Sequence, residues 1–174
     1  MKVKLAPAPL PLNSDAYRPF GDVIAARGHE EGKPANQGTA RRHDQVAELV
    51  NLRPGKAQVN VCVFRADAFK GSTFEVKLLE HHPKTTQMMI PMNCPKHYLV
   101  IVAMGNAEGN APDLSTMKAF LAKSNQGITY HPGVWHHPLI ALDQDTDFAC
   151  VVYEDGSSED CSIHTITPSI QIPL

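Results

Sequence analysis

Short runs rich in valine, isoleucine, phenylalanine and threonine recur along this chain, and turn-forming residues separate them. Most of the 14 prolines and 11 glycines fall between these runs. The spacing leaves little room for helices and is typical of an all-β domain. The predicted strands are residues 58–65, 73–82, 85–92, 97–104, 116–123, 127–130, 134–142 and 147–154. They indicate a sandwich or jelly-roll barrel with a few short helices, and the mouth of such a barrel is a natural small-molecule site.

The N-terminal part of the chain is less regular. A short helix is expected to begin at Ser14-Asp15, which can cap it, and to end before Pro19. Residues 48–50 are a second candidate for a helical turn. A long polar loop is predicted between these two candidates; it begins at Arg27 and has the sequence RGHEEGKPANQGTARRHD. Long ordered loops are often functional, although a merely mobile loop is almost as common.

Length and charge restrict the function. A chain of 174 residues has the usual length of one domain, so residues 1–174 are expected to form a single unit. The formal charge of -2 leaves no basic excess for nucleic acid or anionic lipid. No apolar run approaches membrane-spanning length, and prolines interrupt the opening MKVKLAPAPLPL. We therefore expect a cytoplasmic protein with no nucleic-acid or membrane partner, and free thiols at its four cysteines, which lack CxxC spacing.

The stretch TFEVKLLEHH, residues 73–82, carries the sharpest functional signal. Side chains alternate between the two faces of a strand, so Glu80 and His82 are expected to share the inward face of the apolar row before them. A buried carboxylate needs a cation, a metal or hydrogen-bond donors to compensate it. A structural Glu-His or Glu-Arg pair is the simpler explanation, but acids and bases in clefts gather at functional sites, which favours a functional pair.

Histidines also flank a turn at Pro132-Gly133. If residues 134–142 form one continuous strand, His136 faces the same side as Val134 and Ile140, while Trp135 and His137 face the other. One of the two histidines must then point inward. A hydrogen-bonded core histidine is as common as a ligand, but together with Glu80 it would form a metal-ligand or acid-base set.

Two further side chains extend this set. Arg65 ends an alternating row of valines, and a guanidinium suits a carboxylate, from either a protein residue such as Glu80 or a substrate. Gln87 begins the next apolar run and is expected to face the same cavity. Motifs for phosphate loops, serine hydrolases, zinc proteases and EF-hands are absent from the sequence. The remaining candidates suit a small, polar, anionic ligand.

Four segments make the chain similar to the ureidoglycolate lyases, formerly called ureidoglycolate hydrolases. They are RPFGDVI at 18–24, LLEHHPKTTQMMIPM at 78–92, PDLSTMKAFL at 112–121 and GITYHPGVWHHPLIAL at 127–142. The resemblance implies a cupin-like double-stranded β-helix that forms a homodimer. It also implies a carbon-nitrogen lyase that splits ureidoglycolate into glyoxylate and urea during the allantoin branch of purine degradation. A divalent metal, nickel in particular, is the cofactor that it implies.

The resemblance also suggests roles for individual residues. Catalysis is assigned to Glu80, His82 and His136, and the same three residues with Gln87 are the expected metal ligands. Compared with the usual cupin ligand set, Glu80 replaces a histidine and Gln87 a glutamate, which leaves a weaker, oxygen-rich site. The expected substrate-binding residues are Arg65, Gln87, Asn36, His43 and Trp135.

Two other functions stay open at this point. The barrel could serve a different metal-dependent reaction, such as an oxygenation or an isomerisation, although it lacks a full histidine-rich ligand set. It could instead be a non-catalytic module that binds a small acid, because a binding pocket needs the same arginine and histidines.

Overall fold

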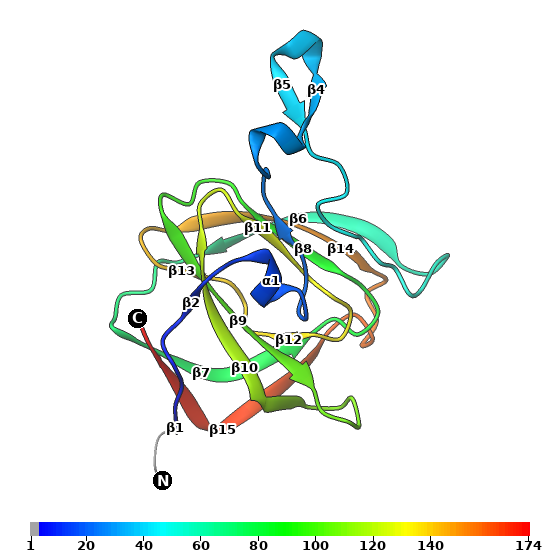
Figure 1. Cartoon of the computed structure of the whole chain (residues 1–174). Helices are drawn as coiled ribbons and strands as arrows, with labels where there is room; N and C mark the ends of the chain where they lie inside the picture. The colour runs from blue at the N-terminus through cyan, green and yellow to red at the C-terminus, as the bar shows by residue number, and fades with distance from the viewer. Residues whose placement is uncertain (1–3) are drawn as a thin grey trace.

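Two large β-sheets face each other in the computed structural model, which describes residues 4–174 (Figure 1). The first sheet has the order β1 (Lys4–Leu5), β15 (Ser162–Pro173), β7 (Thr73–His81), β12 (Trp135–His136), β9 (His97–Gly105), β10 (Pro112–Lys123) and β2 (Leu10–Pro11), and β13 (Ile140–Ala141) also pairs with β9. The second has the order β3 (Val23–Ile24), β11 (Gly127–Tyr130), β8 (Gln87–Pro91), β14 (Thr146–Glu154) and β6 (Gln58–Ala66). This confirms the predicted all-β, cupin-like fold.

The remaining elements are small. A single turn of α-helix, α1 (Ser14–Tyr17), begins where the sequence predicts it. Its cap is Asn13 rather than the predicted Ser14-Asp15, since the Asn13 side chain accepts from the Ala16 amide. Two 3-10 turns, η1 (His29–Glu31) and η2 (Asn36–Gly38), flank strand β4 (Lys33–Ala35), which pairs with β5 (Ala40–Arg42). None of the helices within residues 4–174 is long and apolar enough to cross a membrane.

The space between the sheets holds the first hydrophobic core, which includes Tyr98, Val100 and Val102 of β9. The alternate β9 residues Leu99, Ile101 and Ala103 belong to a second core, on the other side of the first sheet. Strand β9 is therefore covered on both faces, as its continuous apolar sequence predicts. Glu80 and His136 lie opposite each other where β7 and β12 of the first sheet pair.

Several strand predictions need correction. Residues 134–142 do not form one strand, because the chain leaves the sheet at His137 and returns as β13. Residues 48–50 contain no helical turn. The polar segment that begins at Arg27 is not a plain loop but contains the β4–β5 hairpin, which stands away from the barrel (Figure 1). Strand β15 was not predicted, because polar residues and Pro168 interrupt its apolar positions.

The outer face of β6 also differs from expectation. Val59, Val61 and Val63 are 56%, 70% and 59% exposed, although the alternation suggested an inward row. Strand β6 lies at the edge of its sheet, and the opposite residues Cys62 and Ala66 pack against the first core. Alternation alone does not say which of two apolar faces points inward, and here the valine row points outward.

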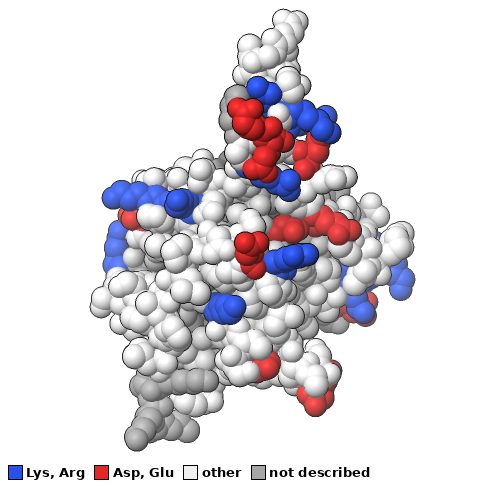
Figure 2. Space-filling model, in the orientation of Figure 1, with Lys and Arg blue, Asp and Glu red and all other residues white. Residues whose placement is uncertain are grey.

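Charged side chains do not concentrate by sign on the visible face of the molecule. Basic and acidic residues are interspersed over the barrel and at the base of the projecting hairpin (Figure 2). This distribution agrees with the small net charge of the whole chain. It suits a small-molecule ligand better than a polyanion.

Candidate active site

Three potential metal-binding or catalytic side chains meet where β7 and β12 pair. Glu80 lies directly opposite His136 across the two strands, and His82 follows β7 by one residue. One donor atom from each of Glu80, His82 and His136 lies within 4.8 Å of the others. Antiparallel pairing places opposite side chains on the same face, which explains how residues 56 positions apart come together.

Backbone carbonyls fix both imidazole rings. The Nδ1 atom of His82 lies 2.8 Å from the Asp160 carbonyl oxygen, and Nδ1 of His136 lies 3.0 Å from that of Val134. A carbonyl can only accept, so Nδ1 carries the proton in both rings. Both Nε2 atoms are buried and have no hydrogen-bond partner within residues 4–174. They are therefore available for a metal ion or a substrate.

Burial and neighbouring charge set the protonation states. Burial alone would raise the pKa of the Glu80 carboxyl, but His136, whose Nε2 lies 3.6 Å from Glu80 Oε1, and His82 hold it below its usual value. Burial lowers the pKa of His82, and His136 lowers it further. At neutral pH the cluster therefore contains an ionised carboxylate beside a neutral His82.

A cavity of about 210 Å³ opens beside Glu80 and His136. Besides these two residues, its lining includes Phe64, Arg65, Gln87, Met89, Tyr130, Leu139 and Phe148. The walls are mainly apolar with a few converging polar groups, which is the usual composition of a small-molecule site. A larger hollow beside α1 contains no histidine, so the smaller cavity is the better candidate for acid-base chemistry.

Tyr130 is a polar lining residue that the sequence analysis did not identify. Its ring stacks on His136 with centroids 3.8 Å apart and an angle of 5° between the planes. The hydroxyl is buried without a hydrogen-bond partner among the described residues, and burial raises its pKa well above the usual value. Tyr130 ends β11 directly opposite Gln87 of β8. Knowing that these strands pair would have revealed it, but that pairing is not visible in the sequence.

The structure places Glu80, His136 and Gln87 in the cavity lining and His82 beside Glu80 and His136, but the alternation that suggested this arrangement is not strict. Val76 and Leu79 both pack in the second core, so the inward face changes between them. The Phe74–Val76 row therefore does not lead into the site. Opposite this point β15 contains a register irregularity, between Thr165 and Ile170.

Arg65 does not point into the core. Its side chain is 73% exposed and forms two hydrogen bonds with Asp147, from Nε at 2.7 Å and from Nη2 at 2.8 Å. The protein partner is therefore Asp147 rather than Glu80. Arg65 still contributes to the cavity lining, at the end of β6. Its role in substrate binding stays a prediction.

Trp135 lies away from the cavity. It is buried in the second core and stacks on His81, with centroids 3.9 Å apart. Because His136 faces the cavity, its strand neighbour must face the opposite side of the sheet. Trp135 is therefore not among the residues that line this cavity, and its contact with substrate stays a prediction.

Asn36 and His43 belong to the projecting hairpin region and, among the described residues, do not line this cavity. A Cβ atom on Gly32 would come within 2.9 Å of His43 Nε2, so this imidazole packs against the hairpin backbone. Asn36 adopts a positive φ of 49° at the hairpin tip. The structure therefore does not bring these two residues to the cavity of the same chain, and their role in substrate binding stays a prediction.

The cluster fits a divalent metal ion. Two imidazole Nε2 atoms and a carboxylate are a common donor set for transition metals, and both rings already direct their unpaired nitrogens inward. The carbonyls that hold Nδ1 also supply the outer hydrogen bonds that metal-binding histidines usually have. Gln87, at the same cavity, could add an amide oxygen.

Fold and site together define a class: an all-β, cupin-like protein with a glutamate and two histidines clustered beside a small cavity. Comparison with known proteins then identifies the family. The model of the ureidoglycolate lyase family matches residues 5–173, and the chain belongs to this family.

Relatives that are named ureidoglycolate lyases support this assignment. The chain is 34% identical to the ureidoglycolate lyase of Pseudomonas syringae pv. tomato over 154 residues, covering 88% of this chain and 86% of the relative. It is 34% identical to that of Pseudomonas aeruginosa (strain LESB58), covering 94% and 92%, and 35% identical to that of Pseudomonas putida (strain W619), covering 90% and 89%. The similarity therefore extends over nearly the whole length of each protein.

Proposed function

We propose that this chain, acting as one unit, is a carbon-nitrogen lyase that cleaves ureidoglycolate into glyoxylate and urea during allantoin and purine degradation. The observation that carries the proposal is the Glu80, His82 and His136 cluster beside a cavity of about 210 Å³, in a member of the ureidoglycolate lyase family. The volume suits a metabolite of this size.

The substrate carries a carboxylate, a hydroxyl and a ureido nitrogen on one carbon atom. When the hydroxyl loses its proton, the oxygen electron pair forms the aldehyde carbonyl. The carbon-nitrogen bond breaks, and the departing nitrogen takes up a proton to give urea. The enzyme must therefore supply a base, a proton donor and an anchor for the carboxylate.

Glu80 is the proposed base. It is ionised at neutral pH because the neighbouring imidazoles keep its pKa low, and it lies at the cavity wall. Tyr130 is the proposed donor to the departing nitrogen. Its raised pKa keeps the hydroxyl protonated, and the hydroxyl has no competing protein partner among the described residues.

Arg65 and Gln87 are the proposed binding residues. Asp147 occupies Nε and Nη2 of Arg65, which leaves Nη1 for a carboxylate that enters the cavity. The Gln87 amide can pair with the ureido group, which has both donors and acceptors. Orientation by these two groups would hold the hydroxyl toward Glu80.

Glu80, His82 and His136, with Gln87, would hold a divalent metal ion, and nickel is our proposal for its identity. When bound, such an ion would supply Lewis-acid stabilisation of the oxygen that develops negative charge. The second carboxylate oxygen of Glu80 would remain for the hydroxyl proton.

The test is product analysis with purified protein and freshly prepared ureidoglycolate, before and after treatment with a chelator. Equal release of urea and glyoxylate supports the lyase, and loss of activity with chelator that nickel restores supports the metal site. Ammonia without urea would indicate amide hydrolysis instead. Binding of glyoxylate without any turnover would favour the small-acid-binding module, and oxygen consumption would favour another metal-dependent reaction.

We also propose that the chain is a homodimer and works in the cytoplasm. The exposed row of Val59, Val61 and Val63 lies on the edge strand β6. Across Ala149 of β14, Val63 is followed by Ile90 of β8, which is 37% exposed, so the apolar surface extends inward from the sheet edge. The β4–β5 hairpin projects on the same side of the barrel (Figure 1). A second copy packed on this surface would remove the valines from water. The free state of all four cysteines suits a reducing compartment.

A further inference from the structure

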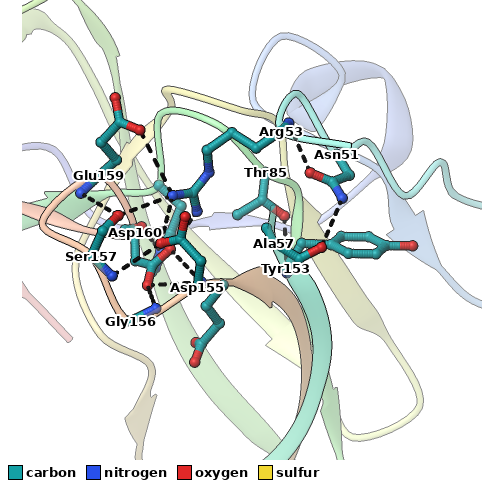
Figure 3. Close-up of polar contacts among 12 residues, drawn as sticks. Asn51, Arg53, Ala57, Thr85, Tyr153, Asp155, Gly156, Ser157, Glu159 and Asp160 are labelled. Atoms are coloured by element: carbon teal, nitrogen blue, oxygen red, sulfur yellow. Dashed lines mark hydrogen bonds and ion pairs between the residues drawn. The ribbon is translucent and has the colours of Figure 1, made fainter. Parts of the chain in front are cut away.

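Arg53 is an almost fully buried arginine outside the cavity. It is only 7% exposed, and its guanidinium binds the loop between β14 and β15 (Figure 3). Nη1 donates to Asp155 Oδ1 at 2.9 Å and to Ser157 Oγ at 3.2 Å, while Nη2 is bonded to Asp160 Oδ1. A buried guanidinium is costly unless several acceptors surround it, and here one loop supplies them.

The Asp160 side chain stabilises this loop by hydrogen bonds to other residues of the same loop. Its carboxylate accepts from the backbone amides of Asp155 and Gly156, the latter at 2.7 Å, as well as from Arg53 (Figure 3). Ser157 donates its amide to Asp155 Oδ1 at 3.0 Å. Residues 155–160 are therefore a compact turn whose shape depends on the arginine and one aspartate.

The backbone of Asp160 also contacts the candidate active site. The Asp160 carbonyl oxygen accepts from Nδ1 of His82 at 2.8 Å. This bond selects the tautomer that carries its proton on Nδ1 and directs Nε2 toward Glu80 and His136. Arg53, Asp160 and His82 thus form a continuous hydrogen-bonded chain from a buried charge to the site.

We propose that Arg53 is a positioning residue for the active site, which fixes the tautomer and orientation of His82 by holding the Asp160 carbonyl in place. A lysine could not replace it fully, because an ammonium group cannot span Asp155 and Asp160 with a planar fork. The consequence for turnover rests on the proposed function, but the effect on the His82 ring does not.

The first variant is Arg53→Lys, with Arg42→Lys as the matched control. Arg42 also pairs with an aspartate, Asp44, but lies on the hairpin and is 74% exposed. Histidine-labelled protein at pH 7.5 is examined by long-range proton-nitrogen NMR, which distinguishes the two ring tautomers, and His82→Gln assigns the signal. We expect R53K to add the Nε2-protonated form of His82, and R42K to keep the wild-type signal.

Kinetics supply the second readout. R53K should lower kcat by up to about 10- to 100-fold, the usual cost when a site histidine loses its outer partner, because the variant no longer holds the Asp160 carbonyl against His82; KM should stay nearly unchanged. If R53K does not fold, Ser157→Ala removes one acceptor of the guanidinium and should shift His82 in the same direction by a smaller amount.

A wild-type His82 signal in the folded variants would overturn the proposal. Absence of ureidoglycolate cleavage in the wild-type protein would instead overturn the proposed function, and the NMR result would still decide the role of Arg53.

Discussion

Tyr130 and Tyr17 are both buried, but their hydroxyl groups differ in hydrogen bonding. The Tyr17 hydroxyl donates to the Thr129 carbonyl at 3.0 Å in the first core, whereas the Tyr130 hydroxyl has no partner within the described chain and lies at the cavity. A hydrogen bond in a core contributes to stability, while an unpaired buried hydroxyl costs stability unless it serves a ligand. The two hydroxyls therefore predict opposite effects of the same substitution.

Tyr130→Phe should lower kcat about 10- to 100-fold, because the departing nitrogen loses its donor, and should leave the free energy of unfolding unchanged or slightly higher. Tyr17→Phe should lower the free energy of unfolding by about 1 kcal/mol and leave kcat unchanged. Urea denaturation and steady-state kinetics on both variants test this. Normal turnover by Y130F would exclude the tyrosine from the reaction.

The buried histidines predict a pH dependence of stability. Burial lowers the pKa of His81, His82 and His137 in the folded chain. Below about pH 6.5, where unfolded histidines take up protons, the unfolded state binds more protons than the folded one, so the free energy of unfolding falls as the pH falls. Above about pH 6.5 these three histidines do not change the free energy of unfolding with pH.

Urea denaturation between pH 7.5 and 5.5 measures this slope. His81→Gln removes one of these three histidines, and His81 lies outside the cluster of Glu80, His82 and His136, so this variant should reduce the slope without abolishing it. A slope identical to that of the wild-type protein would show that His81 titrates alike in both states.

At the scale of elements, the strands near the site were predictable and their pairing was not. The Glu80 and His82 pair was visible because polar residues followed an apolar run, yet the inward face changes between Val76 and Leu79. The alternation correctly separated His136 from Trp135 but could not say that Trp135 faces a second core. When both faces of a sheet are covered by a hydrophobic core, both sets of alternating residues are apolar. The sequence then does not indicate which face of the sheet carries the candidate active site.

The hairpin is the element whose structure differs most from the predicted loop. Strands β4 and β5 pair with each other, and the Asn36 and His43 side chains do not line the cavity of their own chain. Asn36→Ala and His43→Ala should therefore keep kcat and KM within about twofold of the wild-type values, as most surface substitutions do. A large rise in KM would indicate that the hairpin reaches the site of a second copy.

For the whole molecule, the exposed valine row predicts self-association. Val61→Glu should turn a dimer of twice 19.0 kDa into monomers, because a desolvated carboxylate would lie at the centre of the contact. Light scattering after size-exclusion chromatography measures the mass. Leu5→Glu, at a position 69% exposed on the other sheet, is the control and should keep the wild-type mass. A monomeric wild-type protein would contradict the proposed dimer.

The central claim is that Glu80 takes part in the cleavage of ureidoglycolate. The most direct measurement is the rate of urea release by Glu80→Gln, compared with Glu75→Gln on the exposed face of the same strand, where Glu75 pairs with Lys77. Loss of a general base lowers rates by about 10²- to 10⁴-fold, so E80Q should lose nearly all turnover while its circular dichroism stays that of the wild type, and E75Q should remain active. Wild-type urea release by a folded E80Q variant would contradict the account.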